Sequence, residues 1–318
     1  MKQYKKNKKI AISIGDLNGV GIEIALKAHN EVSKKCTPIY CVDADILKKA
    51  STLLNIDIPK DMKLQTVDAE VDAEFIIKPK KTTSASGLYS YKSFVCGVSL
   101  CEEKKVDAVV TMPIHKEAWM MAGLTYKGHT DFLRQHFKQD AIMMLGCKKM
   151  FVALYTEHIP LRDVASTIKK EKIYNFLLDL HKSIGDEKVA VLGLNPHAGD
   201  NGVLGDEEKE IDAAIQMANS TLKKELFYGS IVPDIAFTPY FRENFNYFVA
   251  MYHDQGLAPL KALYFDESIN ISLNLPIIRT SVDHGTAFDI AYTNQAKTKS
   301  YINAIESALE LSKKALTK

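Results

Sequence analysis

Residues 9–32 read KIAISIGDLNGVGIEIALKAHNEV, so an apolar run, a glycine-rich turn and a helical pattern follow one another directly. The run Lys9–Ile14 has the length and composition of a buried β-strand. The apolar residues after the turn recur at helical spacing, at Val20, Ile24, Ala28 and Val32. A strand that turns directly into a helix is the repeating unit of an α/β protein.

The same alternation continues along the chain. Further apolar runs of strand length lie at Pro38–Val42, Val106–Thr111, Met150–Tyr155, Lys188–Leu194 and Tyr247–Tyr252, with helical patterns at Ala44–Leu54 and Ser300–Ala315. Short apolar strands that alternate with helices predict an α/β protein with a largely parallel sheet. Ligands of such sheets bind beyond the carboxyl ends of the strands. Polar residues that directly follow these runs are therefore the candidates for a site.

Composition narrows the class of protein. A length of 318 residues indicates two domains or one large one, and 46% hydrophobic with 25% charged residues is typical of a globular protein. The net charge of +2 favours neither a nucleic-acid nor a membrane partner. Five lysines lie within the first nine residues, but the apolar run Ile10–Ile14 is too short for a signal sequence or a membrane span. We therefore expect a cytoplasmic protein.

The five cysteines form no Cys-x-x-Cys pair. Two Cys-x4-Cys spacings allow zinc binding in principle, but Cys41 and Cys101 fall in or next to apolar, regular segments. We expect buried, reduced thiols at all five positions, which are Cys36, Cys41, Cys96, Cys101 and Cys147.

Three of the nine histidines, His158, His197 and His253, come shortly after separate predicted strands. A single histidine is more often a hydrogen-bonded structural residue than a ligand, and that interpretation stays open. Loops after separate strands are nevertheless where a metal shell is assembled. Neutral imidazoles suit zinc, cobalt or manganese better than calcium or magnesium, and three protein ligands with one open position are typical of a catalytic metal. His115 and His136 are expected on helix surfaces.

Three further segments are rich in ligand-binding residue types. The glycine turn has the spacing Gly-x3-Gly-x-Gly, which departs from the dinucleotide fingerprint and fits a tight strand–helix connection equally well. Arg279, followed by Thr280 and Ser281, forms either an anion clamp or a surface ion pair. The segment His284-Gly285-Thr286 is expected to open a helix, where a base or phosphate can bind.

Taken together, these segments resemble the PdxA family of 4-hydroxythreonine-4-phosphate dehydrogenases, enzymes of vitamin B6 synthesis. The resemblance spans nearly the whole chain, and Leu17 and Ile22 stand where the family has prolines. Its most specific strings are NPHAG at 195–199, YHDQG at 252–256 and RTSVDHGTA at 279–287.

The resemblance implies an isocitrate dehydrogenase-like fold, with two α/β/α domains, mostly parallel sheets and an active-site cleft between the domains. It places residues 1–123 and 284–318 in the first domain. Residues 124–283 form the second domain, with the metal and substrate residues and the dimer interface. A homodimer with its active site at the subunit interface is implied as well.

Particular residues acquire roles from the same resemblance. The implied metal ligands are His158, His197 and His253. The implied substrate-binding residues are His129, Thr130, Lys261, Asn270 and Arg279. The implied catalytic groups are Lys261, Asp254 and Asp234, and the implied cofactor-binding residues are His284, Gly285 and Thr286.

The implied activity is NAD- or NADP-dependent oxidation and decarboxylation of 4-phosphooxy-L-threonine to 3-amino-2-oxopropyl phosphate, assisted by zinc, cobalt or magnesium, for pyridoxal 5'-phosphate synthesis. An alternative is the same chemistry on threonate or erythronate 4-phosphate. A catalytically silent metal- and phosphate-binding protein is a second alternative. A metal-dependent phosphohydrolase is a third, although such enzymes usually have a carboxylate-rich metal shell, which the sequence lacks.

Overall fold

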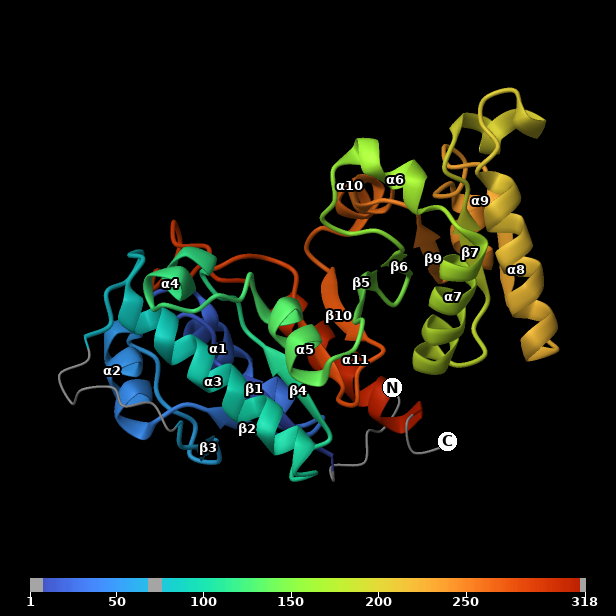
Figure 1. Cartoon of the computed structure of the whole chain (residues 1–318). Helices are drawn as coiled ribbons and strands as arrows, with labels where there is room; N and C mark the ends of the chain where they lie inside the picture. Colours follow the sequence, from blue (N-terminus) through green and yellow to red (C-terminus); the bar gives the residue numbers. More distant parts are fainter. Residues whose placement is uncertain (1–7, 68–75, 315–318) are drawn as a thin grey trace. The chain divides into compact units, whose positions relative to one another are not determined.

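The computed structural model describes residues 8–67 and 76–314, which fold into two compact units (Figure 1). Contacts assign residues 1–140, 269–271 and 275–318 to the first unit, and residues 141–268 and 272–274 to the second. The domain limits implied by the resemblance are retained as a prediction.

The first unit contains a parallel sheet with the strand order β3-β2-β1-β4-β11. Ile12 of β1 lies opposite Tyr40 of β2 on one side and Val110 of β4 on the other. Nearly every residue of the central strands is buried, which explains their continuous apolar sequence. The strands are β1 (Lys9–Ser13), β2 (Thr37–Cys41), β3 (Lys63–Gln65), β4 (Ala108–Thr111) and β11 (Arg279–Val282).

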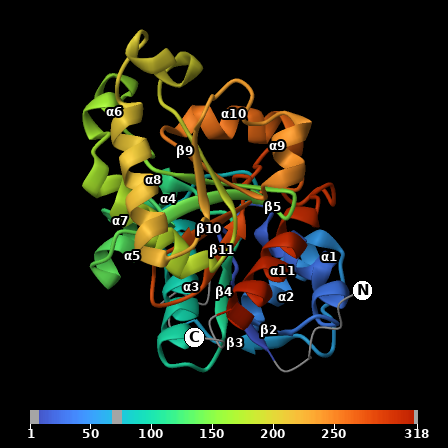
Figure 2. The same cartoon turned by 90° about the vertical axis from the view of Figure 1, so that its right-hand side faces the viewer.

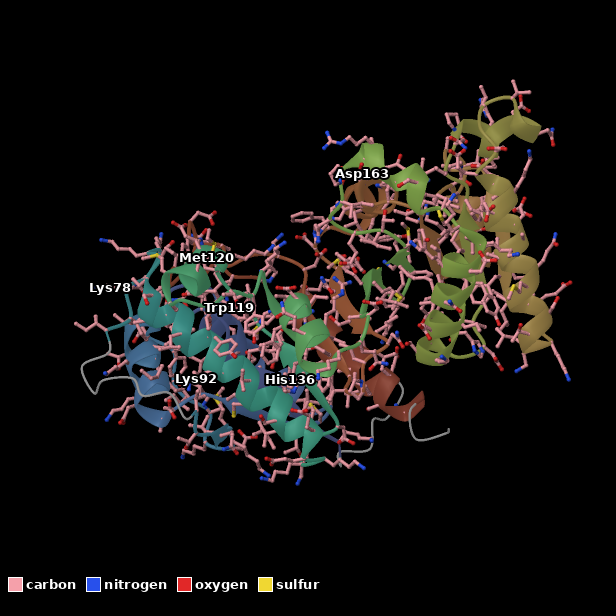
Figure 3. All side chains as sticks on the ribbon, in the orientation of Figure 1. Lys78, Lys92, Trp119, Met120, His136 and Asp163 are labelled. Carbon is pink, nitrogen blue, oxygen red and sulfur yellow. The ribbon has the colours of Figure 1, made fainter. Side chains whose placement is uncertain are left out.

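Helices cover both faces of this sheet. In Figure 2, α3 lies on one face, and α1 and α11 lie side by side on the other. Trp119 of α4, which is labelled in Figure 3, donates from Nε1 to Ser90 Oγ of α3 at 2.8 Å, and this buried bond joins the two helices. The helices are α1 (Gly21–Val32), α2 (Ala44–Leu54), α3 (Ser84–Glu102), α4 (Lys116–Met121), α5 (His129–Phe137) and α11 (Lys299–Lys314).

The second unit has the strand order β5-β6-β9-β7-β8, in which only β5 runs antiparallel to its neighbour. Its strands are β5 (Ile142–Cys147), β6 (Met150–Leu154), β7 (Val189–Leu192), β8 (Phe227–Ile231) and β9 (Tyr247–Ala250). Its helices are α6 (Leu161–Thr167), α7 (Lys170–Ile184), α8 (Glu208–Leu222), α9 (Pro239–Asn244), α10 (His253–Tyr264) and the 3-10 helix η1 (Pro196–Gly202). The remaining strand, β10 (Ile269–Leu273), has residues in both units.

Helix α10 packs tightly on the middle of the second sheet. A Cβ atom on Gly256 would lie 2.4 Å from Val152 Cγ1 and 2.8 Å from Ala250 Cβ, so only glycine fits there. Leu257 and Leu260 of the same helix join the buried cluster over β6 and β9. The close approach fixes the start of α10, and with it His253, against the ends of these strands.

The predicted α/β class with a mostly parallel sheet is confirmed, and all the strands and helices predicted by range are present at or near their expected positions. The helix expected after His284 is wrong: His284 lies in a bend, residues 285–287 have no regular secondary structure, residues 288–294 form turns, and Ala287 has a left-handed φ of 45°. All five cysteines are free thiols, with Cys96 and Cys101 half-buried and the other three buried. Within the ranges 8–67 and 76–314, no helix is long and apolar enough to cross a membrane.

Candidate functional site

The three histidines of the expected metal site lie beyond neighbouring strands of the second unit. Strands β6, β9 and β7 are adjacent and parallel, so their carboxyl ends meet at one edge of the sheet. His158 follows β6, His253 begins α10 directly after β9, and His197 follows β7. The prediction that the three loops share one edge of the sheet is confirmed.

Two of these histidines lie close together. The ring centroids of His158 and His253 are 5.4 Å apart, and the planes are inclined by 43°. His253 Nδ1 lies 2.7 Å from Asp254 Oδ1. A carboxylate on Nδ1 holds the proton there, which leaves Nε2 as the lone-pair nitrogen that can bind a metal. Two imidazoles that face each other at this distance, one of them oriented by a carboxylate, fit two positions of a divalent metal shell.

His197 has a different setting. It lies in η1 with a left-handed φ of 53°, and the next residues up to Asn201 are also left-handed. Its side chain is exposed. Across the part of the chain that the structure describes, no three His, Cys, Asp or Glu side chains are grouped closely enough to hold a metal. The structure thus pairs His158 with His253, and the three-histidine site stays a prediction.

The loop of His197 is held by the carboxylate of Glu208, the first residue of α8. Buried Glu208 accepts from the backbone N–H groups of Leu194 and Asn195 at 2.8 and 2.7 Å, and from Asn195 Nδ2 at 2.9 Å. Gly199 packs against this carboxylate, because a Cβ there would lie 2.7 Å from Glu208 Oε2. The signal that could have revealed Glu208 is its position at the start of a helix that directly follows a glycine-rich loop.

The expected proton-transfer groups of the second unit occupy separate places. Lys261 lies on α10, eight residues after His253, and its Nζ is 5.4 Å from the ring centroid of Phe265. Asp254 is exposed and contacts His253. Asp234 is exposed in the turn after β8. Of these three groups, only Asp254 is brought to the histidine pair by a described contact.

The first unit contains a buried polar cluster around Arg279. This residue begins β11 and is 3% exposed. Its Nε and Nη2 donate to Thr111 Oγ1 at 3.2 and 2.8 Å, and Nη2 also lies 3.1 Å from His129 Nδ1. Burial lowers the pKa of Arg279 to about 9, so the guanidinium is charged at neutral pH. It is therefore a buried cation, and the surface ion pair considered from the sequence is wrong.

His129 completes this cluster as a neutral donor. Burial, with the charge of Arg279 in addition, holds the pKa of His129 well below its usual value. The guanidinium donates to Nδ1, so the proton of the neutral ring lies on Nε2. Nε2 is buried without a hydrogen-bond partner. A charged fork beside an unsatisfied N–H group is suited to bind a phosphate or carboxylate.

Two other expected substrate residues, Thr130 and Asn270, lie in the same unit, whereas Lys261 lies in the second unit. Thr130 follows His129 in the first turn of α5. Asn270 lies in β10, and its Oδ1 is buried without a hydrogen-bond partner. A buried acceptor without a hydrogen bond lowers the free energy of unfolding by about 1–3 kcal/mol. A hydrogen-bond donor on a bound ligand would remove this cost.

The glycine turn contacts the expected cofactor segment. Val20 N–H donates to the Thr286 carbonyl at 3.1 Å, and a Cβ on Gly19 would lie 2.8 Å from that same oxygen. Gly285 is exposed, with nothing within 4 Å of the position of a Cβ atom. The anchored Thr286 and the uncovered backbone at Gly285 fit the close approach of a cofactor.

Two residues of this region were missed or misplaced by the sequence interpretation. Asp16 is fully buried and accepts from Ser86 Oγ at 3.1 Å, and burial raises its pKa. His115 was expected on a helix surface, but it precedes α4 and stacks on Phe288 with ring centroids 4.9 Å apart. Its Nδ1 is buried without a partner. Both residues take these positions through segments distant in sequence, which local patterns do not reveal.

Comparisons with known proteins identify the family of the chain. The model of the family described as pyridoxal phosphate biosynthetic protein PdxA matches residues 34–308. A 4-hydroxythreonine-4-phosphate dehydrogenase of Sulfurimonas denitrificans is 68% identical over 95% of this chain and 97% of its own. One from Campylobacter fetus is 53% identical over 95% and 98%. The crystal structure of 4-hydroxythreonine-4-phosphate dehydrogenase from Klebsiella pneumoniae has a TM-score of 0.81 at 31% identity, and the match covers 96% of this chain and 100% of that one.

Proposed function

The chain belongs to the family of the pyridoxal phosphate biosynthetic protein PdxA and is an oxidoreductase, and from this premise we propose that it oxidises and decarboxylates 4-phosphooxy-L-threonine with NAD or NADP. The product is 3-amino-2-oxopropyl phosphate, a precursor of pyridoxal 5'-phosphate. The observation that carries the proposal is the buried cluster of Arg279, Thr111 and His129, which presents a charged fork and an unsatisfied N–H group to an anion.

The reaction has two steps that balance without any further reactant. In the first, the carbinol carbon gives a hydride to the nicotinamide and the hydroxyl loses a proton, which forms a ketone β to the carboxylate. In the second, the carboxylate leaves as carbon dioxide, and its bonding electrons pass toward the ketone before a proton returns to carbon. Arg279, His129 and Thr130 hold the anionic groups and thereby orient the carbinol carbon.

A divalent ion is part of the proposal, with His158, His253 and His197 as the residues that would hold it. A bound zinc, cobalt or magnesium ion supplies positive charge that lowers the pKa of a hydroxyl and polarises a carbonyl. The contact between His158 and His253, with Asp254 on Nδ1, supports two of these ligands. Lys261, Asp254 and Asp234 are the proposed proton carriers, because an amine or a carboxylate can give or take a proton during the reaction.

The cofactor site proposed here is the segment His284-Gly285-Thr286. The hydrogen bond from Val20 to Thr286 supports this assignment, because it fixes the segment against the glycine turn. The exposed backbone at Gly285 supports it as well. A homodimer with its active site at the subunit interface completes the proposal.

The test is NADH formation, followed by absorbance, with 4-phosphooxy-L-threonine and NAD before and after removal of metal by a chelator. We expect activity that the chelator removes and added metal restores. His158→Ala is expected to abolish the restored activity, whereas His181→Ala is the matched control, since His181 pairs with Asp186 on the surface of the same unit. If only threonate or erythronate 4-phosphate is turned over, the proposed substrate is wrong, whereas the proposed reaction type, oxidation with decarboxylation, is retained. Phosphate release without NADH would refute the dehydrogenase assignment.

A further inference from the structure

The carboxyl ends of β6, β9 and β7 are joined by side-chain hydrogen bonds that the proposed reaction does not use. Two of them meet at Met251, the residue directly after β9 and two residues before His253, and a third joins Gln255 to Gly193. The parallel ladder stops at Ala250, so the polar backbone groups of Met251 must find partners outside it. The residues that satisfy them are Thr156, in the loop of His158, and Gln255, at the start of α10.

Gln255 connects the β9 end to the β7 end. Its Oε1 accepts from Met251 N–H at 2.7 Å, and its Nε2 donates to the Gly193 carbonyl at 2.8 Å. Gly193 directly follows β7 and lies four residues before His197. The amide of Gln255 thus accepts a hydrogen bond at the end of β9 and donates one at the end of β7.

Gly193 transmits this constraint to the loop of His197. A Cβ atom on Gly193 would lie 3.1 Å from Ala198 Cβ and 3.1 Å from Glu208 Oε1. Ala198 is the neighbour of His197, and Glu208 holds the backbone just before it. The Gly193 carbonyl therefore cannot shift without a shift of the loop packed on it.

Thr156 makes the matching connection to β6. Its Oγ1 donates to the Met251 carbonyl at 2.6 Å, and its backbone N–H points to the same oxygen at 3.3 Å. Thr156 is buried and lies two residues before exposed His158. Both polar backbone groups of Met251 therefore have side-chain partners. Gln255, two residues after His253, binds the N–H group, and Thr156, two residues before His158, binds the carbonyl.

We propose that Gln255 is a positioning residue that sets the register of the loops of His158, His197 and His253, with Met251 as the shared point and Thr156 as the second link. The inference rests on the proposed metal site, because that site requires the three histidine loops to bind the same metal ion. Gln255 contacts neither substrate nor metal in this role. It acts through Met251 and Gly193 on the histidines that follow them.

Local helix capping by Gln255 is the competing explanation, because a side chain in the first turn of α10 also satisfies Met251 N–H. Gln255→Glu separates the two. A glutamate keeps the acceptor for Met251 N–H and suits the helix N-terminus, but it cannot donate to the Gly193 carbonyl and places a negative charge against it. Capping alone therefore predicts little change, whereas the positioning role predicts a displaced His197 loop.

Asn219 offers a matched control in the same unit. Its Oδ1 accepts from the N–H groups of Leu226 and Phe227, and its Nδ2 donates to the Phe227 carbonyl at 2.8 Å. This amide joins the end of α8 to the start of β8, whereas the histidine loops follow the carboxyl ends of the strands. Asn219→Asp makes the same chemical change, from amide to acid, away from the histidines.

The experiment measures Co²⁺ binding to the metal-free full-length protein, by visible absorbance of the bound ion, together with amide hydrogen exchange of residues 156–158 and 193–198. Outer-shell partners of metal ligands typically change affinity about 10–100-fold, so we expect Gln255→Glu to raise the Kd for Co²⁺ at least about 10-fold and to alter the absorption band. Exchange in both segments should accelerate. Asn219→Asp should leave the Kd, the band and these exchange rates at their wild-type values.

Two outcomes overturn the inference: wild-type Co²⁺ affinity and exchange rates in Gln255→Glu, or an equal loss in Asn219→Asp. Failure of wild-type protein to bind Co²⁺ would instead reject the proposed metal site, and the positioning role would then be decided by the exchange rates alone. Thr156→Val provides the second variant if Gln255→Glu does not fold by circular dichroism. This variant removes the hydrogen bond from the Thr156 hydroxyl to the Met251 carbonyl. It is expected to accelerate amide exchange in residues 156–158 and to raise the Kd for Co²⁺.

Discussion

Replacing Thr111 by valine removes a single hydroxyl from the interior of the first unit and keeps the branched shape of the side chain. That hydroxyl accepts hydrogen bonds from Arg279 Nε at 3.2 Å and from Nη2 at 2.8 Å. Both residues are buried. Valine therefore leaves two donors of a charged guanidinium facing a methyl group.

The size of the effect follows from this geometry. A hydrogen bond to a charged group contributes about 1.5–3 kcal/mol, and here two donors share one acceptor oxygen. We therefore expect the free energy of unfolding to fall by about 2 kcal/mol for Thr111→Val, within the same range. With a urea dependence of about 2 kcal/mol per molar, the unfolding midpoint should fall by about 1 M.

The assay uses Trp119, which is the only tryptophan of the chain and is fully buried in the same unit. Its fluorescence during urea unfolding therefore reports on the first unit. Thr280→Val is the matched control, because the hydroxyl of that buried threonine donates to the neutral Ala304 carbonyl at 2.8 Å. A neutral hydrogen bond contributes about 1 kcal/mol, so the control should shift the midpoint about half as far. Equal shifts in the two variants, or no shift in Thr111→Val, would refute a charged bond at Thr111.

Three further predictions concern other parts of the first unit. The pKa of His129 is lowered by burial and by the neighbouring guanidinium, so the unfolded chain takes up this proton first as the pH falls below 6.5. The free energy of unfolding should then decrease by up to about 1.4 kcal/mol per pH unit, and the His129→Gln variant should show a flatter dependence between pH 6.5 and 5 by urea titration. The hydrogen bond with Cys41 lowers the pKa of half-buried Cys96, so a thiol reagent should modify Cys96 first, and Cys96→Ser should lose that fast phase. Gly19→Ala would place a methyl group 2.8 Å from the Thr286 carbonyl, and calorimetry should show weaker NAD binding than in Gly285→Ala, where the added methyl meets no atom within 4 Å.

The parts of the fold that the sequence predicts best are the central strands of the two sheets. Strands such as β1, β4, β6 and β9 are buried along almost their whole length, so an unbroken apolar run marks each of them. The carboxyl-end rule then placed three histidine loops at one edge of the second sheet without any structure. Local sequence was sufficient there, because burial on both faces favours apolar residues along most of each strand.

The polar part of the site depends on partners that are remote in sequence. Strand β11 begins with Arg279, whose partners Thr111 and His129 lie 168 and 150 residues away, so no local pattern distinguishes it from a surface arginine. The helix expected after His284 fails for a similar reason. The Thr286 carbonyl accepts from Val20, and Ala287 adopts a left-handed φ, which together replace the helix by turns. The roles of the site residues themselves stay predictions that come from the family resemblance.

The network around Met251 shows why stability and ligand geometry are connected at the end of a parallel sheet. Where a ladder stops, the next N–H and carbonyl groups lose their strand partners but remain too buried to be left unsatisfied. Gln255 satisfies Met251 N–H and the Gly193 carbonyl, and Thr156 satisfies the Met251 carbonyl. Each of these bonds lies two to four residues before a histidine, so the proposed positioning role predicts that the bonds at the strand ends also orient the imidazoles. A protein that binds its ligand beyond a parallel sheet needs no separate scaffold for the histidines, because the polar groups that close the sheet already provide one.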